Sequence, residues 1–93
     1  MNERYAVELS KRAAKDLRKL DRPVQARVLA ALALLRDDPR PATVKALAGH
    51  PGYLRVRVGD YRIVYTIYDG KLLVLVLTLG HRGRDRSPLD DPG

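Results

Sequence analysis

The chain has 93 residues, 45% of them hydrophobic and 31% charged, and a formal net charge of +7. It has no cysteine, which excludes disulfides and thiolate nucleophiles, and no apolar run of membrane-spanning length. We therefore expect one small globular domain over residues 1–93, with a loose tail from 87 to 93, no membrane association and a cytoplasmic location. The positive charge favours an anionic partner, unless it serves only solubility.

The N-terminal region predicts a strand followed by a helix. Apolar and other residues alternate in "YAVEL" (5–9), which is typical of a half-buried strand. Ser10 then occupies an N-cap position before a helix over 11–20. The apolar residues of this helix share one face: Ala13, Ala14, Leu17 and Leu20.

A second helix is predicted from "DRP" (21–23) to about Arg36, where "DDPRP" ends it. Its apolar stripe consists of Val24, Val28, Leu32 and Leu35. We expect Leu29 and Leu34 to widen that stripe.

Residues 40–52 read as a connection broken by Pro and Gly, with room for one short helical turn around 44–47. Three strands follow, over 53–58, 61–68 and 71–79, joined by the two-residue turns Gly59-Asp60 and Asp69-Gly70. The predicted fold is α+β: an N-terminal strand, two helices on one face of an antiparallel sheet, and a C-terminal three-stranded meander.

The first turn sets the register of three arginines in "YLRVRVGDYRIVY" (53–65). A two-residue turn places Arg57 opposite Arg62, with Arg55 on the same face. The opposite face then carries the apolar residues Val56, Val58, Tyr61, Ile63 and Tyr65. Because like charges directly opposite are destabilising, this pattern indicates an anion-binding site, although a solvated basic face is the alternative.

The second turn would place Arg62 opposite Leu77. The arginine face would then also carry Leu73, Leu75 and Leu79, as a partner-binding surface or as part of a strand buried on both sides. The same parity puts His81 on the arginine face and Arg82 on the other, unless Gly80 bends the strand.

Five segments together carry a resemblance: "YAVELSKRAAKDLRKLD", "DDPRP", "VKALAG", "YLRVRVGDYRIVY" and "LGHRGRD". In this order they are similar to the RelE-type toxins of the RelE/ParE toxin–antitoxin superfamily, over residues 3–86. The resemblance implies an α+β toxin that cleaves mRNA in the ribosomal A site without metal or other cofactor. It also implies a cognate acidic antitoxin that wraps the toxin, so that the chain is a monomer or a heteromer with that partner.

The resemblance assigns catalytic positions to Arg55, Arg57, Arg62 and Arg82. His81 is the nearby side chain whose ordinary pKa suits proton transfer, so it is a candidate base or acid; otherwise catalysis rests on positioning with help from the ribosome. For RNA binding we name Tyr53, Lys45, Arg84 and Arg86.

The sequence departs from the family's usual pattern in two ways. Ribosome-dependent members have lysines where Arg55 and Arg57 stand, and an aromatic residue where this chain has Ser87 and Pro88. Arginine holds its proton too firmly to act as a proton shuttle. Two other functions therefore stay open: a ParE-like toxin that inhibits DNA gyrase by protein binding, and a degenerate member that only binds its antitoxin and operator DNA.

Overall fold

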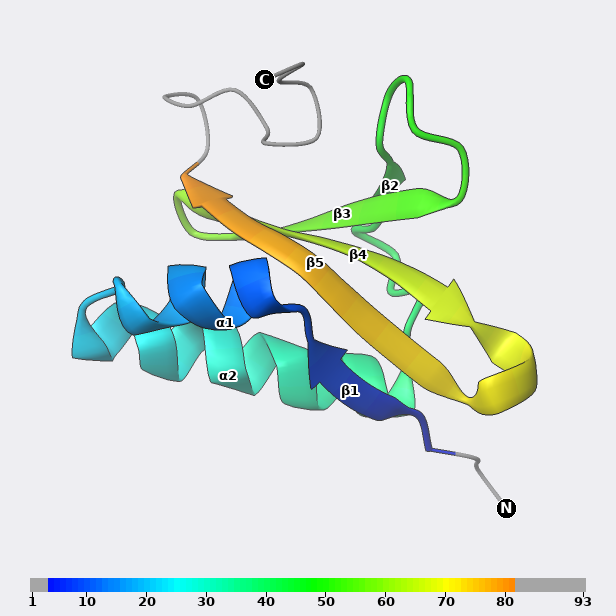
Figure 1. The fold of residues 1–93 in the computed structure, drawn as a ribbon, viewed down its shortest axis with the longest axis horizontal. Coiled ribbons are helices and arrows are strands. Elements are labelled where there is room, and N and C mark those ends of the chain that lie inside the picture. The colour runs from blue at the N-terminus through cyan, green and yellow to red at the C-terminus, as the bar shows by residue number, and fades with distance from the viewer. Residues whose placement is uncertain (1–3, 82–93) are drawn as a thin grey trace.

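The computed structural model describes residues 4–81. Two helices cover one face of a five-stranded sheet with the strand order β1-β5-β4-β3-β2 (Figure 1). The elements are β1 (Ala6–Leu9), α1 (Lys11–Arg18), α2 (Arg22–Asp37), β2 (Lys45–Ala46), β3 (Tyr53–Val58), β4 (Tyr61–Tyr68), the 3-10 turn η1 (Asp69–Lys71) and β5 (Leu73–His81). The predicted α+β class is confirmed, but the sheet is mixed because β1 pairs with β5 in parallel. Among residues 4–81, no helix has the length and apolar character needed to cross a membrane.

Helix α1 begins as the sequence predicts and covers an edge of the sheet. The hydroxyl of Ser10 accepts a hydrogen bond from the Ala13 N–H at 3.0 Å and donates one to the Leu77 carbonyl at 2.8 Å. One turn further on, the Asp16 carboxylate accepts a hydrogen bond from the Thr78 hydroxyl at 2.9 Å. Strand β1 pairs only with the first half of β5, so α1 supplies polar partners for the second half.

Helix α2 buries a narrower stripe than we predicted. Val28, Leu32 and Leu35 are buried against the sheet. Leu29 is 51% exposed and Leu34 70% exposed, so the prediction that they widen the stripe is wrong. Each residue turns a helix by about 100°, which carries these two positions off the buried face. The sheet side of the core is formed by Val56, Ile63, Tyr65, Val74, Val76 and Leu79.

The connection after α2 contains a short strand instead of the predicted helical turn. Lys45 pairs with Arg55 and Ala46 with Leu54, which makes β2 an edge strand beside β3. The N–H of Leu47 donates to the carbonyl of Tyr53 at 2.9 Å and extends this contact. Pairing with β3 gives the backbone partners that a single isolated helical turn would lack.

The second predicted two-residue turn is also wrong. Asp69–Lys71 form a 3-10 turn that ends at Leu72 in the left-handed conformation (φ 49°), and the first pair of the hairpin is Tyr68 with Leu73. The register also shifts between Val64 and Tyr65.

The longer turn moves the pairing by two residues and keeps the faces of β5, whereas the register shift moves it by one and reverses the faces of its second half. Arg62 pairs with Gly80 instead of Leu77, and Leu79 pairs with Ile63 in the core. Leu73 and Leu75 do lie on the arginine side, as predicted, where they pair with Tyr68 and Thr66 and are partly buried. Strand β5 is therefore covered to different degrees on its two faces.

An exposed ionic cluster ties the η1 turn to the rest of the fold. The Arg40 guanidinium binds both carboxylate oxygens of Asp69, at 3.1 and 2.8 Å, and the Tyr5 hydroxyl donates to the same carboxylate at 2.8 Å. These bonds, that from Arg40 first, lower the pKa of Asp69 to about 2. The cluster links the start of β1, the segment after α2 and the β4–β5 turn.

Candidate functional site

The candidate site is built on the hairpin of β3 and β4. Gly59 adopts φ +59°, a conformation open to glycine at little cost, and begins the two-residue turn. The turn pairs Val58 with Tyr61 and Arg57 with Arg62, which is the register that the sequence predicted. Arg55, two residues before Arg57, therefore lies on the same face of the sheet.

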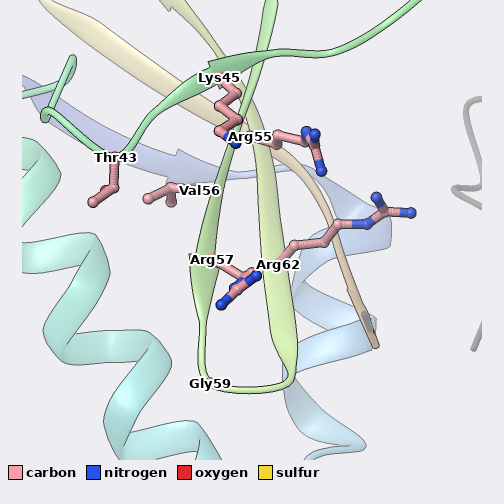
Figure 2. A pocket seen from close by; sticks show the side chains of 7 residues that line it. All are labelled: Thr43, Lys45, Arg55, Val56, Arg57, Gly59 and Arg62. Carbon is pink, nitrogen blue, oxygen red and sulfur yellow. The ribbon is translucent and has the colours of Figure 1, made fainter. Parts of the chain in front are cut away.

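An open pocket of about 720 Å³ adjoins this hairpin, and its lining is mostly basic (Figure 2). The lining residues are Thr43, Lys45, Arg55, Val56, Arg57, Gly59 and Arg62. Lys45 enters from β2, where it pairs with Arg55. The structure thus brings together four of the predicted site residues, namely Lys45 and the three hairpin arginines.

Sequence reasoning missed Thr43. It belongs to the connection that we expected to be irregular or helical. Its place in the pocket follows from the pairing of β2 with β3, which no strong sequence pattern predicts. A hydroxyl at this position adds an uncharged hydrogen-bond donor to the basic lining.

The pocket cations have no carboxylate partner among residues 4–81. Within residues 4–81 the ion pairs are Arg4 with Asp37, Arg12 with Asp16 and Arg40 with Asp69, and none involves Lys45, Arg55, Arg57 or Arg62. Four positive charges thus line one pocket, and no carboxylate in the described part of the chain pairs with them. Such a cluster raises the local concentration of anions and favours a ligand with several negative charges.

The arginines offer their guanidinium groups from different directions. In Figure 2, Arg55 and Arg62 extend to the same side of the hairpin, whereas the Arg57 side chain takes another course. Arg55 and Arg62 are half-buried, so their aliphatic stems cover the sheet, and Arg57 is exposed. A guanidinium binds phosphate through two parallel hydrogen bonds, and guanidinium groups that point in different directions can contact separate phosphates of one strand.

Among the other predicted site residues, Tyr53 is described by the structure and does not line this pocket. Tyr53 lies on the same face of β3 as Arg55 and Arg57, but its ring stacks on that of His50, with ring centroids 5.9 Å apart and planes at 4°. His81 ends β5 paired with Tyr61, so the register from which we predicted its place on the arginine face is wrong: the shift between Val64 and Tyr65 reversed the parity of the second half of β5. Arg82, Arg84 and Arg86 lie outside the described residues.

The chain matches known proteins over most of its length. Residues 7–86 match the family model of the ParE toxin of type II toxin–antitoxin systems. The chain belongs to the RelE/ParE toxin superfamily. Within it the chain is a RelE-type toxin: it is 33% identical over 82 residues to the mRNA interferase toxin RelE of Escherichia coli, covering 86% of this chain and 85% of that protein.

Solved structures support the same assignment. The archaeal RelE–RelB complex of Pyrococcus horikoshii contains a chain that superposes with a TM-score of 0.75 at 30% identity, over 87% of this chain and 98% of that one. A chain of the RelBE2 toxin–antitoxin complex of Mycobacterium tuberculosis superposes with a TM-score of 0.76 at 32% identity, over 85% of this chain and 92% of that one. This chain is therefore similar to toxins that were solved together with an antitoxin.

Proposed function

We propose that this toxin is a ribosome-dependent mRNA endonuclease, and hence acts in the cytoplasm. The observation that carries the proposal is the hairpin register, which gathers Arg55, Arg57 and Arg62 with Lys45 in one pocket without carboxylate partners in residues 4–81. A polyanion with closely spaced phosphates fits such a pocket. Similarity to a RelE named as an mRNA interferase supports mRNA as that polyanion.

The proposed reaction is attack of a ribose 2′-hydroxyl on the adjacent phosphorus. The new 2′-oxygen–phosphorus bond closes a 2′,3′-cyclic phosphate, and the bond to the 5′-oxygen of the next nucleotide breaks. Negative charge builds up on the non-bridging oxygens, where the guanidinium groups of Arg55, Arg57 and Arg62 would stabilise it. One proton must leave the 2′-hydroxyl and one must reach the departing 5′-oxygen.

These arginines do not move the two protons, because a guanidinium holds its proton throughout the working pH range. His81 stays a predicted base or acid for one of the two proton transfers, although the register that placed it on the arginine face no longer supports this role. We propose that the main contribution of the chain is positioning and charge stabilisation, with ribosomal groups assisting proton transfer.

We also propose that a cognate acidic antitoxin inhibits the toxin by neutralising this pocket. Carboxylates can bind the same guanidinium forks as phosphates do. The solved relatives include toxin–antitoxin complexes, in agreement with such a partner. A monomer in the free state and a heteromer with the antitoxin follow from this proposal.

A gyrase-directed toxin is the second candidate, because the matching family model is that of the ParE toxin. On that alternative the basic pocket would contact an acidic surface of a protein and no bond would be cleaved. A degenerate toxin that only binds its antitoxin would also leave RNA intact.

A cleavage assay with the purified protein separates these functions. End-labelled mRNA is bound to ribosomes with a vacant A site, and gyrase supercoiling is measured in parallel. We expect cleavage that yields a 2′,3′-cyclic phosphate, is abolished by a single 2′-deoxy substitution at the scissile nucleotide, and leaves gyrase unaffected. Intact mRNA with inhibited gyrase would refute the nuclease proposal.

A further inference from the structure

A fifth cation approaches the pocket from the other layer of the fold. The Nη1 atom of Arg27 lies 3.6 Å from the position that a β-carbon on Gly59 would occupy, and Gly59 lines the pocket. Arg27 belongs to α2, which passes the tip of the hairpin on the left of Figure 2. Because Gly59 has no side chain, the guanidinium can approach the backbone of the turn closely.

The charge of Arg27 has no evident structural purpose. Its side chain is exposed, and within residues 4–81 no ion pair or hydrogen bond of this guanidinium is found, although Asp60 is next to Gly59 in the turn. An uncharged side chain could cover the glycine without adding a positive charge beside the hairpin arginines. The positive charge of Arg27 is therefore available to an anion bound at the hairpin tip.

The cations extend further than one phosphate requires. Lys45 pairs with Arg55 at one end, and Arg27 meets Gly59 at the other. Gly59 lies four positions after Arg55, which corresponds to roughly 13 Å at about 3.3 Å per residue. A group of this length can contact consecutive phosphates of one strand.

We propose that Arg27 binds a second phosphate of the RNA strand, adjacent to the phosphate held by Arg57. Helix α2 thereby contributes to RNA binding and sets where the strand passes the hairpin tip. The inference rests on the proposed function for the identity of the ligand. It assigns Arg27 to binding and leaves the chemical step to the hairpin.

The test measures binding without cleavage. The probe is a fluorescent single-stranded RNA with 2′-O-methyl groups throughout, which removes the nucleophile, and its anisotropy is followed over a series of NaCl concentrations. Arg27→Gln is compared with Arg36→Gln, a matched exposed arginine nine residues further along α2 and so about 13.5 Å away along the axis. Both changes remove one charge from the same helix, and circular dichroism checks that the helix content is unchanged.

We expect Arg27→Gln to weaken binding roughly threefold to tenfold and to lower the slope of log K against log [NaCl] by about 0.7, the contribution of one phosphate contact in a single strand. Arg36→Gln should bind within about twofold of the wild type. Wild-type affinity and slope for Arg27→Gln, or equal losses in both variants, would overturn the inference. So would a loss of antitoxin binding with RNA binding intact.

The inference and the proposed function can fail separately. If wild-type protein leaves ribosome-bound mRNA intact but Arg27→Gln still lowers RNA affinity and salt slope, the nuclease proposal fails and the Arg27 assignment stands. If mRNA is cleaved and Arg27→Gln binds the probe as the wild type does, the Arg27 assignment alone is wrong.

Discussion

Replacing Arg57 with threonine should stabilise the fold while weakening the site. Arg57 and Arg62 are direct cross-strand partners, and a like-charge pair in this geometry costs roughly 0.2–1 kcal/mol. Arg57 is exposed and therefore screened by solvent, so we take about 0.5 kcal/mol as the expected gain. For a domain of this size, that gain raises the melting temperature by roughly 2–4 °C.

Urea denaturation at low and high salt measures this gain, and a double-mutant cycle isolates its cause. The gain should shrink in 1 M NaCl, where the Debye length is only about 3 Å, and should disappear in an Arg62→Thr background. Arg57→Lys keeps the charge and should leave stability close to that of the wild type. A gain of equal size in both backgrounds would mean that the strand propensity of threonine explains it, and a net loss would refute the repulsion argument.

Two predictions concern the pH dependence and the core. The lowered pKa of Asp69 contributes stability above the ordinary value of 3.8 that is lost as the pH falls toward about 2, so urea midpoints of Asp69→Asn should fall less than those of the wild type between pH 4 and 2. A midpoint difference that stays constant over this range would contradict the pairing with Arg40. Tyr65 is buried, its hydroxyl donates to the Pro39 carbonyl at 2.8 Å, and burial raises its pKa to about 12. Tyr65→Phe should therefore lower the free energy of unfolding by about 1 kcal/mol at pH 7. The wild type should lose stability above pH 10, because the folded state resists ionisation of the buried phenol and the unfolded state does not. Unchanged mRNA cleavage by Tyr65→Phe would show that the loss concerns the core alone.

The sequence predicted the elements whose local signals are strong. Ser10 caps its helix, and Gly59 makes the tight turn that fixes the pairing of Arg57 with Arg62. The register of this hairpin, and with it the placing of Arg55, Arg57 and Arg62 on one face, could be derived from a two-residue turn and strand alternation alone. The resemblance to RelE-type toxins, carried by the same residues, is confirmed by the comparisons.

Errors arose where tertiary contacts override local patterns. Asp69-Gly70 is a common two-residue turn, but the chain adds a 3-10 turn there, with Leu72 in a left-handed conformation that no pattern indicates. Because a strand has a period of two, the longer turn, which moves the pairing by two residues, kept the predicted faces, whereas the one-residue register shift between Val64 and Tyr65 reversed the face assigned to Leu79. The contribution of Thr43 depends likewise on strand β2, which is only two residues long.

The rate of mRNA cleavage by Arg62→Ala tests the central claim most directly. The rate is measured under single-turnover conditions on ribosomes with a vacant A site, at saturating protein, with Arg36→Ala as the control on α2. If the hairpin arginines stabilise the charge on the phosphate, Arg62→Ala should cleave about a hundredfold more slowly or worse, and Arg36→Ala should cleave at the wild-type rate. Cleavage by Arg62→Ala within about threefold of the wild type would contradict the assignment of this hairpin as the site of RNA cleavage.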